Sequence, residues 1–195
     1  MLNDINFHKE LNQKLKNGGV IAFVTDTVWG VGCLPNNEEA VKKIYELKGR
    51  DTSKPLILMS NSIENLKPYV KTIPRAAQKL IDEHFPGALT LIFEKTDKAP
   101  YSISSNKDTI GIRVPNNETF KRICEVVDGH VLATTSANLS NQPSAKNYEE
   151  AKEFIGSYVD YVFEDYGNEA KGLESTVALA LTEDVKVLRQ GEVKL

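Results

Sequence analysis

The chain has 195 residues, of which 41% are hydrophobic and 26% are charged, and its mean hydropathy is -0.34. This composition excludes a disordered or membrane protein and fits one folded domain, which we expect to span residues 1–195. A net charge of -3 argues against a general nucleic-acid coat, because such proteins need an excess of base to release phosphate counterions.

The first residues and the rare residue types predict a cytoplasmic protein that holds no metal ion of its own. Residues 1–6 lack an apolar signal core, and no apolar run approaches the length of a membrane span. Cys33 and Cys124 lack the paired spacing of a zinc site, so we expect two reduced thiols. The three histidines lie outside the polar clusters, so no Ser/His/Asp or Cys/His arrangement is indicated.

Helical and strand patterns alternate from the start of the chain. Phe7, Leu11 and Leu15 have helical spacing and predict a first helix. Residues 20–24 form a continuous apolar run, which is typical of a strand buried on both faces. Residues 25–27 then place two hydroxyls and a carboxylate at the strand end, where α/β sheets commonly bind ligands. The alternative is a polar turn in which the carboxylate bonds its own backbone.

Three cations, Lys48, Arg50 and Lys54, lie within seven residues after the second predicted helix. That helix places Val41 and Ile44 on the same face as Lys48, so we expect Lys48 to point inward, toward a cleft. Arg50 offers a planar fork for phosphate or carboxylate and Lys54 a mobile point charge, so the loop suits a polyphosphate. Alternatively, these cations only offset the helix dipole and lie in solvent.

The rest of the chain continues the alternation. Further elements are expected as strands at 56–59, 89–93, 109–115, 131–134, 177–181 and 185–188, helices at 74–84, 120–127 and 148–155, and loops at 95–108 and 165–172. This order predicts an α/β fold in a single domain, with a twisted, open, mixed parallel and antiparallel sheet and flanking helices.

Two of the later strands carry polar side chains that have both a structural and a functional interpretation. Ile110 and Ile112 share one face of their strand, whereas Gly111 and Arg113 share the other, so Arg113 has a small neighbour. Arg113 then either faces a cleft or lies at a solvated sheet edge. Residues 134–140 form the densest run of hydroxyls and amides, which bind phosphate and ribose oxygens or cap helices.

The chemistry that remains is that of cations and hydroxyls at strand ends. There is no Gly-rich phosphate loop of the dinucleotide or Walker type. The candidate site residues are Thr27, Lys48, Arg50, Lys54, Arg113, Thr134, Ser136, Asn138, Ser144, Ser175 and Arg189. Such a set fits phosphoryl or nucleotidyl transfer, usually with Mg²⁺, because that chemistry needs positioning and charge stabilisation rather than an activated nucleophile.

Seven sequence blocks, in order, make the chain resemble the YrdC/TsaC family across about residues 7–193. They are residues 25–30, Lys48-Gly49-Arg50 with Lys54-Pro55-Leu56, residues 85–90, Ile112-Arg113-Val114-Pro115, Ser136-Ala137-Asn138, Ser175-Thr176-Val177 and Leu188-Arg189. The joint KxR and SxN signatures are the distinctive part of this resemblance.

The resemblance implies a YrdC-like fold and an L-threonylcarbamoyladenylate synthase, a nucleotidyltransferase. Such an enzyme joins L-threonine, bicarbonate and ATP, with Mg²⁺, to give threonylcarbamoyl-AMP and pyrophosphate. Its product feeds the t⁶A modification of tRNA, so the implied partners are the downstream tRNA threonylcarbamoyl transferase machinery and possible RNA, with no membrane.

The resemblance also implies a role for each site residue. Those implied to bind L-threonine are Thr27, Met59, Arg113, Thr134 and Ser175, with Arg113 on the carboxylate. Those implied to bind ATP are Arg50, Lys54, Thr109, Ser136, Ser144 and Arg189. Those implied to be catalytic are Lys48, Arg50, Ser136 and Asn138.

Several positions depart from the family pattern, and two alternatives stay open. Trp29 stands where tyrosine is usual and Met59 where histidine is common, which leaves the amino-acid specificity less defined than nucleotide use. The first alternative is a double-stranded RNA-binding YrdC-like module without catalysis. The second is a paralogue acting on a different carbamoyl substrate, like the YrdC-like part of hydrogenase maturation proteins.

Overall fold

The strands of the protein form one mixed sheet in a computed structural model that describes residues 1–49, 53–138 and 144–195. Within these residues the sheet has nine strands in the order β7-β1-β2-β6-β3-β5-β4-β8-β9. Their bounds are β1 Ile21–Phe23, β2 Gly30–Cys33, β3 Ile57–Ser60, β4 Leu89–Glu94, β5 Thr109–Arg113, β6 Val131–Ser136, β7 Tyr161–Val162, β8 Thr176–Leu179 and β9 Lys186–Arg189.

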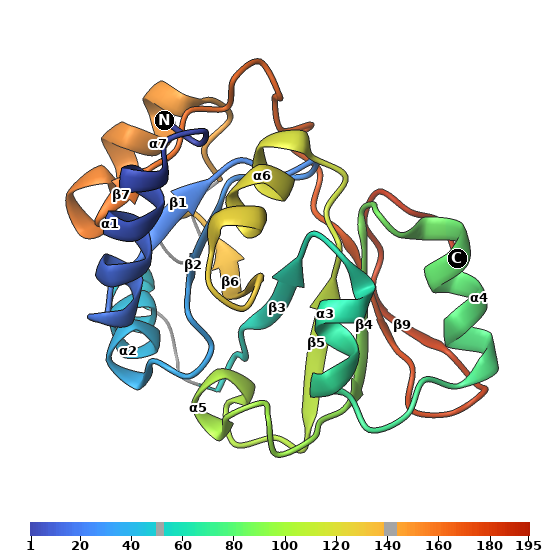
Figure 1. Cartoon of the computed structure of the whole chain (residues 1–195). Helices are drawn as coiled ribbons and strands as arrows, with labels where there is room; N and C mark the ends of the chain where they lie inside the picture. Colours follow the sequence, from blue (N-terminus) through green and yellow to red (C-terminus); the bar gives the residue numbers. More distant parts are fainter. Residues whose placement is uncertain (50–52, 139–143) are drawn as a thin grey trace.

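Helices flank both ends of this sheet. Figure 1 shows α1, α2 and α7 around the β7-β1-β2 end and α3 and α4 around the end that contains β4 and β9. Their bounds are α1 Ile5–Lys16, α2 Glu38–Lys48, α3 Ile63–Leu66, α4 Arg75–His84, α5 Tyr101–Ser104, α6 Glu118–Val126 and α7 Tyr148–Ile155, with short 3-10 turns at Lys67–Tyr69 and Gly156–Tyr158. No helix among the described residues is long and apolar enough to cross a membrane.

The sheet has the mixed character that the sequence predicts. The pairs β1–β7, β3–β5 and β4–β8 are parallel, whereas β1–β2, β2–β6, β3–β6, β4–β5 and β8–β9 are antiparallel. The antiparallel β8–β9 pair at the end of the chain follows from the short spacing between these two strands. The fold class predicted from the sequence is therefore confirmed.

Strand β1 is buried on both faces, as its apolar run predicts. Ile21 and Phe23 belong to one apolar cluster, which includes residues of α1 and α6. Ala22 belongs to the second cluster, which includes residues of α2 and α7. The two clusters cover opposite faces of the strand, because successive side chains of a strand alternate between faces. This two-sided burial anchors the loop that follows β1.

Strand β2 is an element that the sequence pattern did not predict. It contains Gly30 and Gly32, which lower strand propensity and concealed the pattern. A Cβ atom built on Gly30 would lie 2.9 Å from the ring of Phe23, and one on Gly32 would lie 3.1 Å from Cγ2 of Thr134. The glycines are thus required by close packing across the β1–β2–β6 part of the sheet, and they leave room for Thr134.

Helix α2 begins and ends where its sequence signals lie. The side chain of Asn37 accepts a hydrogen bond from the backbone N–H of Ala40 (3.0 Å), and Glu38 and Glu39 occupy the first turn. Gly49 caps the other end with φ of 52°, a left-handed conformation that glycine adopts at little cost. This cap places Lys48 in the last turn of the helix, next to the sheet.

Candidate active site

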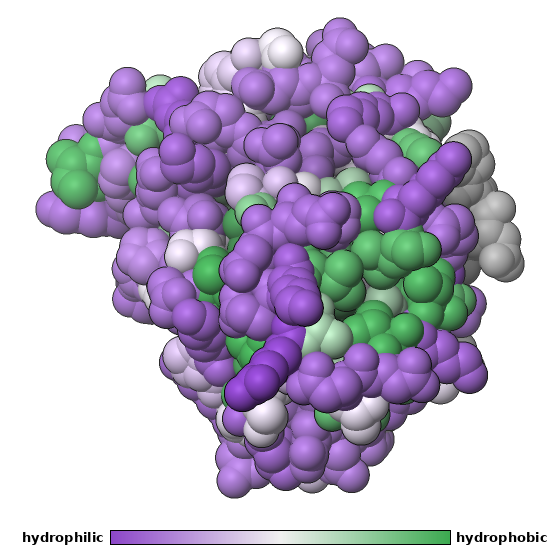
Figure 2. Space-filling view, turned by 90° about the vertical axis from the view of Figure 1, so that its right-hand side faces the viewer, coloured by the Kyte–Doolittle hydropathy of each residue, from purple (hydrophilic) through white to green (hydrophobic). Residues whose placement is uncertain are grey.

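A cleft of about 590 Å³ is lined by residues of strands β6, β3, β5, β4, β8 and β9 and by Lys48 at the end of α2. Alternate residues of β5 line it, namely Thr109, Gly111 and Arg113, whereas Ile110 and Ile112 belong to the core. This alternation is the one predicted from the sequence. Figure 2 shows apolar residues gathered in a hollow with a hydrophilic border, on the side of the molecule that carries β9.

Lys48 lies at one end of the cleft and is 4% exposed. Its Nζ donates to the backbone oxygens of Ser136 (2.6 Å) and Asn138 (2.9 Å) and to Oδ1 of Asn138 (2.8 Å). The hydroxyl of Ser136 also donates to Oδ1 of Asn138 (2.7 Å). These bonds hold the Asn138 amide in one orientation, so Lys48, Ser136 and Asn138 form one rigid unit. The prediction that Lys48 points inward is confirmed.

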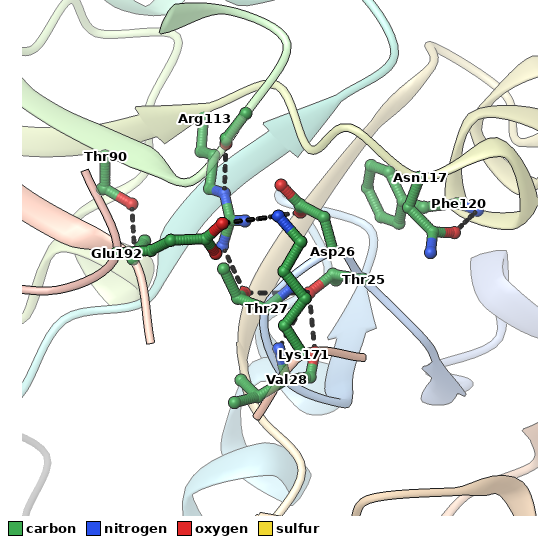
Figure 3. A network of polar contacts seen from close by, with 12 residues as sticks. Thr25, Asp26, Thr27, Val28, Thr90, Arg113, Asn117, Phe120, Lys171 and Glu192 are labelled. Carbon is green, nitrogen blue, oxygen red and sulfur yellow. Dashed lines mark hydrogen bonds and ion pairs between the residues drawn. The ribbon is translucent and has the colours of Figure 1, made fainter. Parts of the chain in front are cut away.

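Arg113 lies at the other end of the cleft and is 2% exposed. Its strand, β5, lies between β3 and β4 and is therefore not at an edge of the sheet. Its Nη2 pairs with the carboxylate of Asp26 (2.5 Å), its Nη1 donates to Oγ1 of Thr27 (2.8 Å) and its Nε donates to the oxygen of Gly87 (2.9 Å). Burial lowers the pKa of Arg113, and the Asp26 carboxylate opposes that shift. Figure 3 shows Asp26 and Thr27 beside the guanidinium of Arg113.

The loop after β1 is held by its own hydrogen bonds and supplies two partners of Arg113. The hydroxyl of Thr25 donates to the backbone oxygen of Val28 (2.6 Å) and lies 3.0 Å from the hydroxyl of Thr27. This turn directs Thr27 and Asp26 toward Arg113. The alternative in which Asp26 only bonds its own backbone does not hold, because Asp26 is the ion-pair partner of Arg113.

Strands β8 and β9 bring further polar groups to the same cleft. The Ser175 hydroxyl lies 2.9 Å from the hydroxyl of Thr90 on β4. Arg189 donates from Nη2 to the backbone oxygen of Ser175 (2.9 Å) and pairs through Nη1 with Glu174 (2.6 Å). Arg189 is 46% exposed, so its side chain can exchange Glu174 for another anion at low cost.

The remaining predicted residues divide into three groups. Met59, Lys54, Thr109 and Thr134 line the cleft, and the backbone of Lys54 accepts a hydrogen bond from the hydroxyl of Tyr45 on α2 (3.0 Å). Ser144 is half-buried and is not among the described residues that line the cleft. Arg50 lies outside the described residues. Trp29 is fully buried against Tyr148, and it is also absent from the described lining residues.

The polar lining residues that had no assigned role in the sequence interpretation include Thr90, Lys107 and Glu174. Thr90 shares its strand face with Ile92, so the period-two pattern of β4 contained the signal that would have found it. Lys107 belongs to the segment predicted as a polar loop, and Glu174 immediately precedes the predicted Ser175. Neither has a local sequence feature that distinguishes it from a surface charge.

The cleft is electrostatically suited to an anion. Its described lining residues include five cationic side chains, those of Lys48, Lys54, Lys107, Arg113 and Arg189, and one acidic side chain, that of Glu174. The apolar residues Ile57, Ile92, Val177, Leu179 and Leu188 form much of the remaining wall. Cations at both ends and an apolar wall between them suit a ligand with charged groups and a flat apolar part.

A family model covers most of the sequence. The Sua5/YciO/YrdC model, described as telomere recombination, matches residues 13–191. The chain belongs to the Sua5/YciO/YrdC family. The resemblance found from the seven sequence blocks is therefore confirmed.

Sequence relatives of this Sua5/YciO/YrdC protein include two named threonylcarbamoyl-AMP synthase. The one from Vibrio campbellii is 35% identical over 188 residues, which cover 95% of this chain and 99% of the relative. The one from Pyrococcus abyssi is 37% identical over 175 residues, which cover 89% of this chain and 50% of the relative. This chain thus spans about half the length of the second protein.

A solved structure of the Sua5/YciO/YrdC family has the same fold. It is P. abyssi Sua5 complexed with L-threonine, which matches with a TM-score of 0.86 and 32% sequence identity. The match covers 94% of this chain and 54% of that chain. The architecture described above is thus that of a known family member.

Proposed function

We propose that this chain is a threonylcarbamoyl-AMP synthase, which makes threonylcarbamoyl-AMP and pyrophosphate from L-threonine, bicarbonate and ATP. The observation that carries the proposal is the cleft itself, in which a buried arginine with hydroxyl neighbours faces a cationic end built around Lys48. The names of the V. campbellii and P. abyssi relatives and the threonine complex of P. abyssi Sua5 support the same activity.

The Arg113 end suits an amino-acid carboxylate. The guanidinium of Arg113 has five N–H groups, and its hydrogen bonds to Gly87, Thr27 and Asp26 use three of them. Two N–H groups therefore remain for a substrate carboxylate. The hydroxyls of Thr27, Thr134 and Ser175 also line this cleft, and they suit the hydroxyl and amino groups of threonine. Met59 adds an apolar contact that fits the threonine methyl group.

The Lys48 end and the rim of the cleft suit a triphosphate. Lys54 and Arg189 bring mobile charge to the rim, and Ser136 and Thr109 bring hydroxyls without charge. These groups compensate the negative charge that builds on the phosphates as pyrophosphate leaves. Arg50 and Ser144 remain predicted ATP ligands, although Arg50 lies outside the described residues and Ser144 is not among the described residues that line the cleft.

The proposed reaction takes two steps, because the carbamate must form before its oxygen can attack phosphorus. The amino group of threonine, once deprotonated, attacks the carbon of bicarbonate or of CO₂ formed from it, and a carbamate forms with loss of water. A carbamate oxygen then attacks the α-phosphorus of ATP, the bond from that phosphorus to the bridging oxygen breaks, and pyrophosphate leaves. The rigid unit of Lys48, Ser136 and Asn138 is placed to orient the reacting groups for this in-line transfer.

Mg²⁺ enters this proposal as the ion that accompanies ATP. Glu174 is the one acidic side chain among the described lining residues, and the described residues contain no group of three or more His, Cys, Asp or Glu suited to a metal. The donor set therefore fits an ion carried by the triphosphate and water, which Glu174 would approach from the protein side. When bound, Mg²⁺ offsets phosphate charge.

The product would be consumed in a downstream step. An acyl adenylate is an activated donor, so the threonylcarbamoyl group would pass to an adenosine of tRNA, as in t⁶A modification, through a separate transferase. The overall charge of -3 gives no support to a general affinity of this chain for RNA.

The decisive experiment is pyrophosphate release from ATP by the purified protein, with threonine and bicarbonate omitted in turn. We expect release only when both are present, together with the mass of threonylcarbamoyl-AMP. Replacement of threonine by serine ranks the selectivity of the Met59 contact. ATP binding without release in any mixture would instead favour an RNA-binding module or a different carbamoyl substrate.

A further inference from the structure

Glu192, which follows β9, has an arrangement that the roles above do not use. Its Oε1 pairs with the ammonium of Lys171 (2.5 Å), whereas its Oε2 is buried and has no hydrogen-bond partner. A buried carboxylate oxygen without a donor is costly, so a donor group that reaches it is bound with favourable free energy.

The Glu192 carboxylate is an electrostatic neighbour of Arg113, although Glu192 itself is not among the described residues that line the cleft. Figure 3 shows the ion pair of Glu192 with Lys171 in the same group of side chains as Arg113 and Asp26. The negative charge of Glu192 also favours the charged form of Arg113, after the stronger effect of Asp26. Glu192 is therefore an electrostatic neighbour of the group that would bind the substrate carboxylate.

Two backbone hydrogen bonds hold this arrangement in place. The N–H of Gly172 donates to the oxygen of Thr27 (2.7 Å), which fixes the segment that carries Lys171 next to the loop after β1. The N–H of Glu192 donates to the oxygen of Glu174 (3.1 Å), which fixes the segment after β9 next to Ser175. Glu192 is thus positioned by the same backbone that positions two of the predicted threonine ligands.

We propose that Glu192 binds the α-ammonium group of the amino-acid substrate and so selects α-amino acids over their α-hydroxy analogues, an inference that rests on the proposed function. In an α-amino acid the ammonium and carboxylate are attached to the same carbon. A carboxylate on Arg113 therefore brings the ammonium close to Glu192, which is an electrostatic neighbour of Arg113. Asp26 already pairs with Arg113, whereas Glu192 has an oxygen without a partner.

Lys171 holds the place of the substrate ammonium in the free protein. Its side chain is 64% exposed, so its ion pair with Glu192 is weakened by solvent and easily exchanged. The last torsion of a glutamate side chain is broad, so the carboxylate can rotate to turn its unpartnered oxygen toward the substrate. Binding thus replaces one ammonium by another and adds a donor for Oε2.

The same contact sets the amino group for the first chemical step. The ammonium must lose a proton to solvent before its nitrogen can attack carbon, and the contact with Glu192 fixes where that nitrogen lies. Glu192 therefore orients the amino group, while Arg113 holds the carboxylate.

The test compares two ligands on three proteins by calorimetric titration. The ligands are L-threonine and 2,3-dihydroxybutanoate, which carries a hydroxyl in place of the ammonium. The proteins are the unaltered chain, Glu192→Gln and Lys171→Met. We expect Glu192→Gln to weaken threonine binding by about 10- to 100-fold, the size of a charge-assisted hydrogen bond, and to leave dihydroxybutanoate binding unchanged.

Lys171→Met separates this role from a purely structural one. It breaks the same ion pair but leaves the Glu192 carboxylate in place, so threonine binding is expected to stay the same or to tighten. Equal losses in Lys171→Met and Glu192→Gln, or equal losses for both ligands, would show that Glu192 only anchors the segment after β9. Unaltered threonine binding by Glu192→Gln would overturn the assignment as well.

The outcome is also distinguishable from a failure of the proposed function. If the unaltered chain does not bind L-threonine at all, the substrate itself is wrong, and the role of Glu192 falls with it. If the unaltered chain binds threonine and releases pyrophosphate but the variants show no difference between ligands, only the role of Glu192 is wrong. The melting temperature of each variant checks that it is folded.

Discussion

At the scale of single residues, Lys48 carries the strongest functional expectation. Its ammonium bonds the backbone oxygens of Ser136 and Asn138 and the side chain of Asn138, so it is a part of the site that no other described cation duplicates. We expect Lys48→Met to lower the rate of adenylate formation by about 100- to 1000-fold, comparable to the loss of one preorganised donor. Pyrophosphate release at saturating ATP and threonine measures this rate.

Lys42 is the matched control for Lys48, because it lies on the same helix but on the solvent side. Its ammonium pairs with Glu46 at 3.7 Å, and its side chain is 77% exposed. Lys42→Met is therefore expected to keep the parental rate. A rate loss of similar size in both variants would show that the helix, and not the Lys48 ammonium, determines activity.

The two cysteines are expected to be chemically inert in the folded protein. Burial raises the pKa of Cys33 to about 12 and also raises the pKa of Cys124. Only the thiolate reacts with alkylating reagents, so neither residue is expected to be labelled at pH 8 in the native state. Mass spectrometry after iodoacetamide treatment is expected to show no adduct until a denaturant is added, and two adducts afterwards. Rapid native labelling would contradict the burial of both side chains.

At the scale of secondary-structure elements, helix α4 shows a contact that local sequence does not reveal. Pro74 stands at the N-cap position and offers no side-chain hydrogen bond. The carboxylate of Glu183, in the turn between β8 and β9, accepts instead from the backbone N–H groups of Arg75 (3.0 Å) and Ala76 (2.9 Å). These bonds lower the pKa of Glu183 in the folded protein.

This lowered pKa predicts how the stability of the protein depends on pH. The folded state holds the Glu183 proton less tightly than the unfolded state, so the contribution to stability is full above the unfolded pKa. It is lost as the pH falls through the folded pKa. Glu183→Gln is expected to melt at a lower temperature than the unaltered protein at pH 7. This difference in melting temperature should narrow below about pH 4. Glu153→Gln, an exposed change on α7, should melt at the same temperature as the unaltered protein. A melting-temperature difference for Glu183→Gln that does not change with pH would contradict the capping role.

The elements also show what the sequence could and could not predict. Helix α2 was predictable, because its cap, its apolar stripe and its terminal glycine are local signals. The inward direction of Lys48 followed from the same stripe. Strand β2 was not predictable, because Gly30 and Gly32 are explained only by contacts with Phe23 and Thr134 across the sheet.

The site shows the same limit. The alternation along β5 placed Arg113 on the cleft face, but the edge alternative could be rejected only once β5 was seen between β3 and β4. The partners of Arg113 come from loops more than twenty residues away, and so does the carboxylate of Glu192. Pairing between distant segments depends on topology, which residue patterns specify weakly.

At the scale of the whole molecule, the charge of the cleft opposes the charge of the protein. The chain has a net charge of -3, yet five cations and one acid line the described part of the cleft. A cationic cleft in an acidic protein attracts a small polyanion while the rest of the surface repels long ones. This separation suits a protein that binds ATP but acts before the RNA step.

The separation predicts different salt dependences for the two substrates. Added salt screens the attraction between the exposed cations at the rim and the triphosphate, whereas L-threonine has no net charge and Arg113, its proposed binding group, is buried. We expect KM for ATP to rise by about tenfold between 0.05 and 0.5 M NaCl and KM for threonine to change much less. Steady-state pyrophosphate release at each ionic strength measures both constants.

Two lysine variants test whether the rim of the cleft causes the effect. Lys107→Ala is expected to reduce the salt dependence of KM for ATP, because Lys107 lines the cleft. Lys186→Ala, on the exposed strand β9, is expected to leave that salt dependence unchanged. An equal rise for both substrates would show that salt acts on the fold of the protein rather than on the rim of the cleft.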